Sequence, residues 1–312
     1  MNSSGKIGND CKILVTGGSG LVGTHLKKYL PNATYISSKD YDLTKESEVI
    51  ELMSNNWDVI IHLAAKVGGI FDNIQNPGIY YEDNVMMNTL ILKYARITGV
   101  KKLIGVLSTC IYPDTNWRYP IHLEDLHLGP PTQTNFSYGY AKRSMAVQID
   151  AYNQQWGTEW MYLVPCNLYG NGDKDDESKS HFVTALIKKI ADAKENGDDK
   201  ITLFGDGSPI RQFIHADDFA KIISLVIERD IKESFNVASD ETYTIKEIAN
   251  LAIDVCVPNL KIEFDTTKPN GQLRKDVTYT ELKRIISDFE FIKLKNGIKQ
   301  TYDEYRKNKS SI

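Results

Sequence analysis

The chain has 312 residues, 41% of them hydrophobic and 25% charged, a composition typical of a soluble globular protein with a sizeable core. Its 37 basic and 41 acidic residues give a net charge of −4, which argues against the basic face that nucleic-acid binding requires. No apolar stretch is long enough to span a membrane. The four cysteines form no CxxC pair, so we expect no zinc site and no disulfide framework, and a reducing, cytoplasmic location.

Short apolar runs alternate with helical patterns through the first half of the chain. The runs are rich in β-branched residues, as strands buried on both faces are. This alternation predicts an α/β fold, a Rossmann-type doubly wound parallel sheet over residues 10–170. The runs lie at 12–16, 33–37, 58–63, 102–107 and 161–166, and the helical patterns near 21–30, 44–55, 79–98 and 136–156.

After residue 170 the pattern is less regular and predicts a smaller α/β domain, mainly substrate-binding, over 171–312. The polar stretch NGDKDDESKSH predicts a loop, and helical patterns follow at 182–195, at 217–229 and from Thr244 onward. We expect some segments of 201–240 to return to the first domain. The alternative is that the whole second half continues the same sheet.

The stretch VTGGSGLVG, residues 15–23, lies between the first predicted strand and the first predicted helix. Gly17, Gly20 and Gly23 are three residues apart. Glycines at this turn allow a positive φ and let a pyrophosphate approach the backbone and the helix N-terminus. The position of the pattern in the first βαβ unit predicts a dinucleotide site.

The end of the second predicted strand reads SSKDYDL, residues 37–43. An acid that grips the ribose 2′-hydroxyl favours NAD, whereas a nearby cation favours NADP. Ser37, Ser38 and Lys39 come before Asp40, so we expect NADP(H) as the cofactor. The alternatives are that Asp40 grips the ribose and that Lys39 is an ordinary surface lysine.

Tyr138 and Lys142 are four residues apart, so they share one face of the predicted helix at 136–156. A free phenol has a pKa of about 10, and we expect the neighbouring ammonium to lower it. The pair could then exchange a proton with a carbinol oxygen, and Ser108, at the end of the fourth strand, could bind the same oxygen. The alternative is a chance Tyr–Lys spacing.

Residues 107–114 read LSTCIYPD and place Cys110 just after the fourth strand, at the edge where open α/β sheets bind ligands. Cys110 is therefore a candidate reactive thiol. The alternative is a core cysteine, and Cys166, also at a strand end, is a rival. Of the histidines, His62 and His215 are expected to be structural.

Together these motifs resemble the extended short-chain dehydrogenase/reductase family. Further segments narrow the resemblance to its GDP-4-keto-6-deoxy-mannose 3,5-epimerase/4-reductases, and it covers nearly the whole chain. The resemblance implies an NADPH-dependent bifunctional enzyme that converts GDP-4-dehydro-6-deoxy-D-mannose to GDP-L-fucose. These segments are HLAAKVGGI (62–70), NLYG (167–170), SHFVTALI (180–187), GDGSPIRQFIH (205–215) and KPNGQ (268–272).

The resemblance also implies residue roles. Cys110 and His181 match the epimerisation base and acid, and Tyr138 matches the reductive proton donor, supported by Ser108 and Lys142. The implied substrate contacts are Cys110, Asn167, Lys189, Phe204, Arg211 and Asn270, of which Phe204 replaces a usual tryptophan and Asn270 a usual aspartate. The implied cofactor contacts are Gly17, Gly18, Ser19, Gly20, Leu21, Val22, Gly23, Ser37, Ser38, Lys39, Asp42, Leu43, Ala64, Ala65, Leu107, Ser108, Tyr138, Lys142, Pro165, Asn167, Leu168 and His181.

For partners, the resemblance implies a GDP-sugar substrate and a homodimer joined through the Rossmann-domain helices near 79–98 and 136–156. We expect no metal, nucleic acid or membrane. One alternative is a related reductase or epimerase acting on another GDP-4-keto-6-deoxy sugar. Another is a non-catalytic NADP-binding regulator, but such a protein is expected to lose Tyr138, Lys142 or Cys110, and this chain keeps all three.

Overall fold

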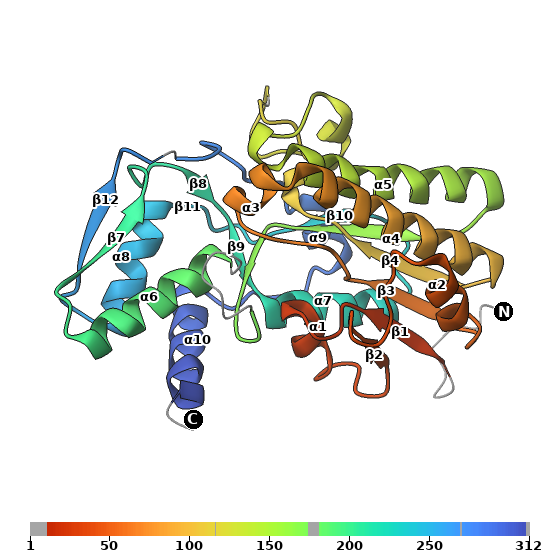
Figure 1. The fold of residues 1–312 in the computed structure, drawn as a ribbon, viewed down its shortest axis with the longest axis horizontal. Helices are drawn as coiled ribbons and strands as arrows, with labels where there is room; N and C mark the ends of the chain where they lie inside the picture. Colours follow the sequence, from red (N-terminus) through yellow and green to blue (C-terminus); the bar gives the residue numbers. More distant parts are fainter. Residues whose placement is uncertain (1–10, 116, 174–180, 269, 310–312) are drawn as a thin grey trace.

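The computed structural model describes residues 11–115, 117–173, 181–268 and 270–309 (Figure 1). The polar stretch at 1–10 and most of the predicted acidic loop lie outside these residues. Among the described helices, none combines the length and apolar character needed to cross a bilayer.

A six-stranded parallel sheet forms the centre of the larger lobe, which confirms the predicted fold class. Every residue of β3, β4 and β5 is buried, as expected for strands covered on both faces. In order across the sheet, the strands are β10 (Phe235–Val237), β5 (Met161–Pro165), β4 (Lys102–Val106), β3 (Val59–His62), β1 (Ile13–Thr16) and β2 (Thr34–Ile36).

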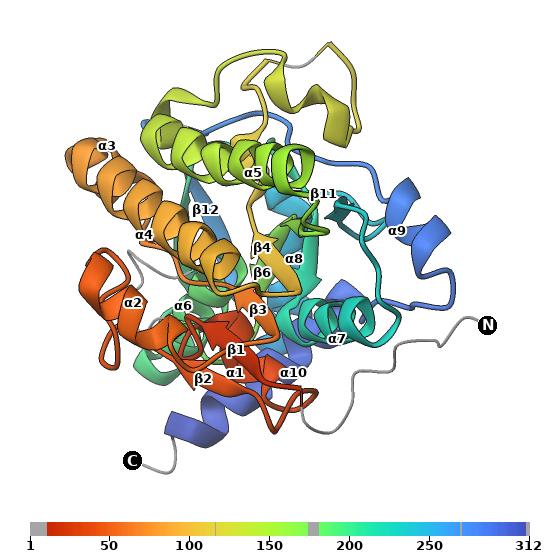
Figure 2. The ribbon, with the colours of Figure 1, turned by 90° about the vertical axis from the view of Figure 1, so that its right-hand side faces the viewer.

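Helices cover both faces of this sheet (Figure 2). On one face α4 (Pro77–Ile97) packs against α2 (Glu46–Met53) and α5 (Phe136–Trp156), and on the other α1 (Leu21–Leu26) packs against α7 (Ala216–Glu228). A short helix, α9 (Thr280–Ile285), lies against the edge strand β10. The sheet is therefore shielded from water on both sides, and its strand ends are left for ligands.

The smaller lobe has its own hydrophobic cluster, built mainly from three helices. Thr244 begins one of them with a capping box, because its hydroxyl accepts the Glu247 N–H while the Glu247 carboxylate accepts from Thr244. The helices are α6 (Phe182–Asn196), α8 (Ile245–Cys256) and α10 (Leu294–Lys309). The strand pairs are β7 (Lys200–Phe204) with β12 (Lys261–Asp265), β8 (Ile210–Arg211) with β11 (Tyr243–Thr244), and β6 (Asn167–Tyr169) with β9 (Phe213–His215).

Several short elements were not predicted from the sequence. The helical ones are α3 (Ile70–Gln75) and three 3₁₀ turns at Thr109–Ile111, Leu123–His127 and Gln133–Asn135. Each spans fewer than two helical turns, so no hydrophobic period can be recognised in it. Two of these turns carry residues of the site described next.

Candidate active site

A crevice of about 750 Å³ lies at the carboxyl ends of β1, β4 and β5. Parallel strands place their carboxyl ends on the same edge, so segments far apart in the sequence meet there. The crevice brings together most of the predicted site residues. Those that line it are Gly17, Ser19, Gly20, Leu21, Val22, Gly23, Ser37, Ser38, Asp42, Leu43, Ala64, Ala65, Leu107, Ser108, Cys110, Tyr138, Lys142, Pro165, Asn167, Leu168 and His181.

The glycine loop forms one wall of the crevice. Gly17 has φ +71°, and a Cβ there would lie 2.8 Å from the Ala64 nitrogen. A Cβ on Gly23 would lie 2.7 Å from the Gly18 backbone. Side chains at these positions would disrupt the cradle, so the loop fits a dinucleotide pyrophosphate. Gly18 does not line the crevice, because its missing side chain makes room for Tyr35.

A tight turn follows β2. Ser37 donates its backbone N–H and its hydroxyl to the Asp40 carboxylate, each at 2.8 Å, and these bonds lower the pKa of Asp40. The carboxylate is thus engaged within the turn, and Lys39 is exposed and does not line the crevice. Ser37, Ser38 and Tyr41 line the crevice at this turn, so the contact predicted between Lys39 and the cofactor stays a prediction.

Tyr138 and Lys142 both face the crevice from α5. The Lys142 side chain is buried, its ammonium donates to the Val106 carbonyl at 2.9 Å, and burial lowers its pKa to about 7. Burial, reinforced by nearby Cys110, raises the pKa of Tyr138. The predicted lowering of that pKa by Lys142 is therefore not found. The phenol stays protonated at neutral pH, which suits a proton donor.

Ser108 and Cys110 are placed by the first 3₁₀ turn. Ser108 ends the strand in an extended conformation and caps the turn, its hydroxyl accepting the Cys110 N–H at 3.4 Å. This cap turns the chain sharply at the mouth of the crevice. A hydroxyl and a thiol two residues apart therefore both line the crevice.

The Cys110 thiol has two strong neighbours. Its sulfur lies 3.0 Å from the Lys275 Nζ and 3.1 Å from the Asn135 Nδ2. Burial alone would raise the pKa of Cys110, but the Lys275 charge and hydrogen bonds from Ser108, Lys275 and Asn135 outweigh it and bring the pKa to about 7. Burial raises the pKa of the rival Cys166 well above its usual value. Cys110 is therefore the more acidic of the two thiols.

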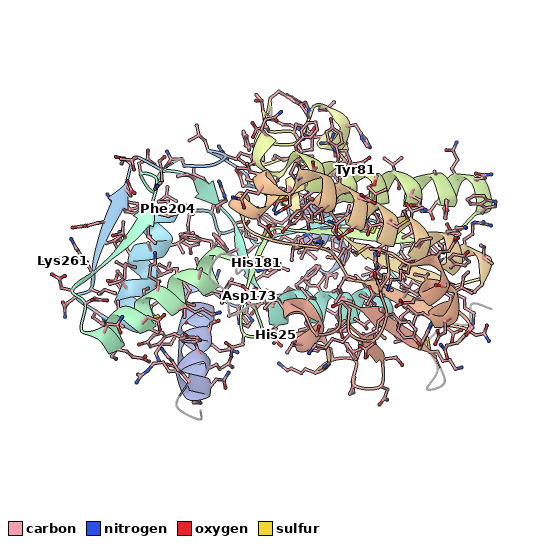
Figure 3. All side chains as sticks on the ribbon, in the orientation of Figure 1. His25, Tyr81, Asp173, His181, Phe204 and Lys261 are labelled. Carbon is pink, nitrogen blue, oxygen red and sulfur yellow. The ribbon has the colours of Figure 1, made fainter. Side chains whose placement is uncertain are left out.

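His181 begins α6 and is held by Asp173 (Figure 3). The carboxylate accepts the His181 backbone N–H at 2.8 Å and lies 3.1 Å from the ring Nδ1. The Asp173 side chain is only 4% exposed, whereas that of His181 is 43% exposed. A carboxylate at Nδ1 holds the proton there, so Nε2 is the ring nitrogen free to exchange a proton.

The two histidines expected to be structural are fully buried. His62 lies between the Thr16 hydroxyl, 2.7 Å away, and the Asn88 side chain, 3.0 Å away, and burial lowers its pKa to about 3. Burial likewise lowers the pKa of His215 to about 4. Both rings stay neutral at physiological pH, and neither lines the crevice.

Four predicted substrate residues lie outside the crevice lining, on the smaller lobe. Lys189 donates to the Thr202 carbonyl at 2.9 Å, and Asn270 accepts the Asp206 N–H at 2.8 Å. Arg211 donates to two backbone carbonyls, and Phe204 is 58% exposed. Figure 3 shows Phe204 on the smaller lobe and His181 where the lobes meet.

Lys275, Asn135 and Asp173 were not among the residues predicted from the sequence. Lys275 is followed by an acid and preceded by an arginine, which is a common surface pattern. Only the tertiary fold reveals their partners. Other lining residues that were not predicted are Ile36, Tyr41, Thr44, Leu63, Lys66, Val67, Gly68, Asn73, Asp83, Met87, Val106 and Cys166.

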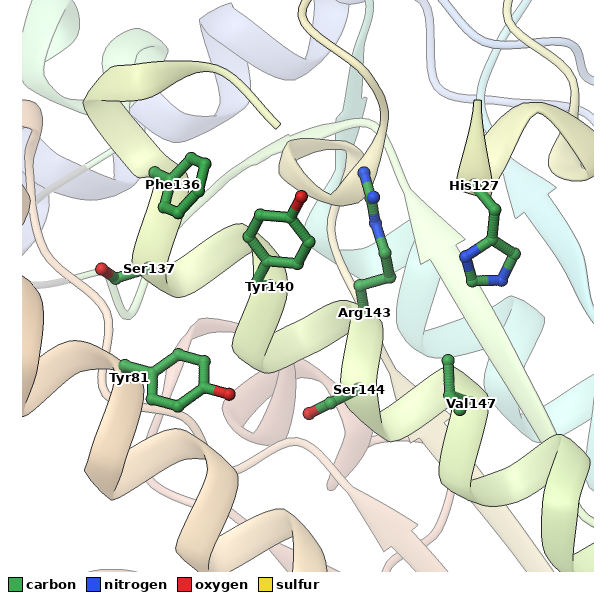
Figure 4. A pocket seen from close by; sticks show the side chains of 8 residues that line it. All are labelled: Tyr81, His127, Phe136, Ser137, Tyr140, Arg143, Ser144 and Val147. Atoms are coloured by element: carbon green, nitrogen blue, oxygen red, sulfur yellow. The ribbon is translucent and has the colours of Figure 1, made fainter. Parts of the chain in front are cut away.

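A second, more open pocket of about 500 Å³ lies on the outer side of α4 and α5 (Figure 4). It contains no residue of the crevice. The Arg143 guanidinium lies 5.0 Å from the Tyr140 ring centroid and donates to the Gly129 carbonyl. The lining residues are Tyr81, His127, Phe136, Ser137, Tyr140, Arg143, Ser144 and Val147.

The chain is similar to a known protein family and to individual named proteins. The model of the NAD dependent epimerase/dehydratase family matches residues 13–238, which is most of the chain. The chain belongs to this family. A protein of Drosophila melanogaster named probable GDP-L-fucose synthase is 33% identical over 95% of this chain and 99% of its own. A GDP-L-colitose synthase of Yersinia pseudotuberculosis is 32% identical over 96% of this chain and 99% of its own.

A solved structure of a relative supports the same placement in the epimerase/dehydratase family. The GDP-L-fucose synthetase of Naegleria fowleri, bound to NADP, superposes with a TM-score of 0.90 and 30% identity, covering 100% of this chain and 97% of its own. These matches confirm the family resemblance drawn from the motifs.

The contact between Asp173 and His181 should fix the tautomer of the His181 ring. In the intact protein His181 should be the Nδ1–H tautomer. Asp173→Ala should shift it strongly toward Nε2–H, since a hydrogen bond to a charged group contributes about 1.5–3 kcal/mol. Nitrogen-15 NMR of labelled histidine measures this ratio, and His62 is an internal control that should not change. An unchanged His181 tautomer would contradict the assignment.

Proposed function

We propose that the chain is a GDP-L-fucose synthase, an NADPH-dependent 3,5-epimerase/4-reductase that acts on GDP-4-dehydro-6-deoxy-D-mannose. The observation that carries the proposal is a single crevice holding an acidic thiol, Cys110, and a protonated phenol, Tyr138, beside a dinucleotide loop. The thiol suits carbon-acid chemistry, and the phenol suits proton donation to a reduced ketone. Relatives over the full length carry the same activity in their names.

Epimerisation needs a base and an acid on opposite faces of the sugar. The carbon-4 ketone acidifies the protons at carbons 3 and 5. The Cys110 thiolate takes one of these protons, and the C–H electron pair moves toward the carbonyl to give an enolate oxygen at carbon 4. His181, protonated at Nε2, returns a proton to the other face, and the carbonyl re-forms. Each positioned acid or base typically contributes about 10²–10⁴-fold.

The oxygen at carbon 4 needs hydrogen-bond donors in both half-reactions. Tyr138 and Ser108 can supply them to the enolate during epimerisation. In the reduction, Tyr138 gives its proton to the same oxygen as it becomes a hydroxyl. Lys142, whose ammonium donates to the Val106 carbonyl, is placed by α5 one helical turn from Tyr138 and can stabilise the resulting phenolate.

The cofactor we propose is NADP(H), which supplies the hydride to carbon 4 when bound. The residues present fit it, since Gly17 and Gly23 leave the cradle open and Ser37 and Ser38 offer hydroxyls where the second strand ends. Reduction then fixes the product, because a sugar without the ketone no longer enolises. The free thiols of the chain support a cytoplasmic location.

A second candidate is the same chemistry on a different GDP-keto sugar. It is favoured by the Yersinia relative named GDP-L-colitose synthase, which matches this chain nearly as well as the fucose synthases do. Phe204 and Asn270, which depart from the usual residues, lie on the smaller lobe and bear on sugar or base recognition. The reacting groups are the same in both candidates.

Product analysis in D₂O tests the proposed reaction. With NADPH and GDP-4-dehydro-6-deoxy-D-mannose, the protein should form GDP-L-fucose carrying deuterium at carbons 3 and 5, as seen by NMR. Cys110→Ser should stop deuterium uptake while NADPH still binds. Tyr138→Phe should still allow uptake, at a reduced rate because Ser108 remains as a donor to the enolate, and should slow NADPH oxidation by about 10²–10⁴-fold. No NADPH oxidation by the unaltered protein would refute the proposal.

The partner we propose is a second copy of the chain, joined through α4 and α5. These helices carry apolar side chains that are 40–48% exposed, among them Tyr81, Met86, Phe136 and Val147. Leu90, in contrast, is buried in the hydrophobic core of the larger lobe. Several of the exposed residues surround the open pocket of Figure 4, and a partner helix would cover them.

A charge on this face should break the dimer. Val147→Asp should give a monomer by light scattering at micromolar concentration, because burying an unpaired carboxylate costs several kcal/mol. Ile50→Asp on α2 is the matched control, since both side chains are 48% exposed, and it should leave the mass unchanged. A Val147→Asp protein with the mass of two chains would contradict this interface.

A further inference from the structure

Lys275 is a buried lysine whose charged end meets a sulfur. It is 9% exposed, and its Nζ lies 3.0 Å from the Cys110 Sγ. Among the residues that the structure describes, no carboxylate lies within ion-pair distance of this Nζ. A buried ammonium is costly unless an anion compensates it. The thiolate of Cys110 is the anion within reach.

The backbone around Lys275 is fixed on both sides. Ile210 donates to the Leu273 carbonyl at 2.8 Å, and Ile121 donates to the Asp276 carbonyl at 2.9 Å. The Arg274 guanidinium pairs with the Asp276 carboxylate, with Nε 2.6 Å from Oδ1. Asp276 is therefore neutralised by Arg274 and not by Lys275. These contacts hold the backbone at Lys275 in place before any ligand binds.

The other polar groups around Cys110 have different partners. Arg211, on β8, donates to the Ile210 and Gln272 carbonyls, and Lys142, on α5, donates to the Val106 carbonyl. His181 lines the same crevice but is held by Asp173.

The uncharged neighbours of the sulfur are Ser108, Asn135 and Tyr138. Of the cations among the described residues, Lys275 is the one whose hydrogen bond reaches the sulfur.

We propose that Lys275 is a positioning residue that holds Cys110 as a thiolate in an ion pair, so that the base is ready before the sugar enters. This inference rests on the proposed function, because it explains how a thiol can act as a carbon base. The thiolate, and not the thiol, is the form of cysteine that can accept a proton. Asn135 supplies a second donor that orients the sulfur.

Removal of the Lys275 charge should raise the pKa of Cys110. Burial is the largest influence on the Cys110 thiol and would raise its pKa above the usual value of 9.0. The Lys275 charge is the largest of the opposing influences, and together with hydrogen bonds from Ser108, Lys275 and Asn135 it brings the pKa to about 7. Removing the charge leaves burial in place. The pKa should then rise by well over one unit, and the thiolate fraction at pH 7 should fall at least tenfold.

Alkylation of Cys110 tests the ion pair without any sugar. The NADP-bound protein is treated with iodoacetamide between pH 5.5 and 9.5, and the Cys110 peptide is followed by mass spectrometry. The unaltered protein should show a half-maximal rate near pH 7. Lys275→Met and Lys275→Gln should react at least tenfold more slowly at pH 7, with the midpoint moved up by more than one unit. Lys275→Arg should restore most of the reactivity.

The outcomes separate this proposal from the proposed function. An unchanged alkylation profile in both uncharged variants, with a raised KM for the sugar, would overturn it and make Lys275 a substrate contact only. Retained NADP affinity shows that each variant is folded, and Lys275→Gln, which keeps a polar end to the side chain, serves if Lys275→Met does not fold. If the profile moves but the unaltered protein does not turn over the GDP sugar, the ion pair stands and the proposed reaction fails.

Discussion

The site depends on one constraint of the parallel sheet: all its strands end at the same edge. β1 ends in the glycine loop, β4 in Ser108 and Cys110, and β5 in the segment that leads to Asn167. Three separate parts of the sequence therefore supply the glycine loop, the thiol and Asn167 to one crevice. The helices on both faces keep the sheet rigid, so these groups keep their relative positions.

Within that crevice the environment gives the thiol and the phenol opposite proton affinities. Both are partly shielded from bulk water, which by itself favours the neutral form. Cys110 has Lys275 in direct contact and becomes acidic, whereas no cation among the described residues makes such a contact with Tyr138, which stays protonated. One residue is thus ready to accept a proton and the other to donate one, at the same pH, which a bifunctional enzyme needs.

The sequence predicted much of the fold because long elements carry a readable period. The boundaries of α5, 136–156, matched the pattern, and the five N-terminal strands lie in the predicted apolar runs. Gly17, Ser108 and Cys110 converge because alternating strands and helices make a parallel sheet, whose strands end at one edge, and α5 brings Tyr138 to the same edge. That these residues meet in one crevice could therefore be predicted without knowledge of side-chain contacts.

Contacts that only the tertiary structure creates could not be predicted from the sequence. Lys275 is 165 residues from Cys110 and reaches it only because the chain crosses back between the lobes. That Lys39 lies outside the crevice lining was not predictable either, because a local turn closed by Ser37 and Asp40 decides which side chains line the crevice. The depressed pKa of Lys142 comes from burial against β4, which no spacing in the sequence reveals.

The most direct measurement of the central claim is a crystal structure of the protein with NADP and GDP-L-fucose. The account predicts Tyr138 Oη and Ser108 Oγ within about 3 Å of the oxygen at carbon 4. It also predicts Cys110 and His181 on opposite faces of the sugar ring, next to carbons 3 and 5. A sugar bound with Cys110 and His181 on one face, or with Tyr138 directed away from carbon 4, would contradict the claim that one crevice performs both half-reactions.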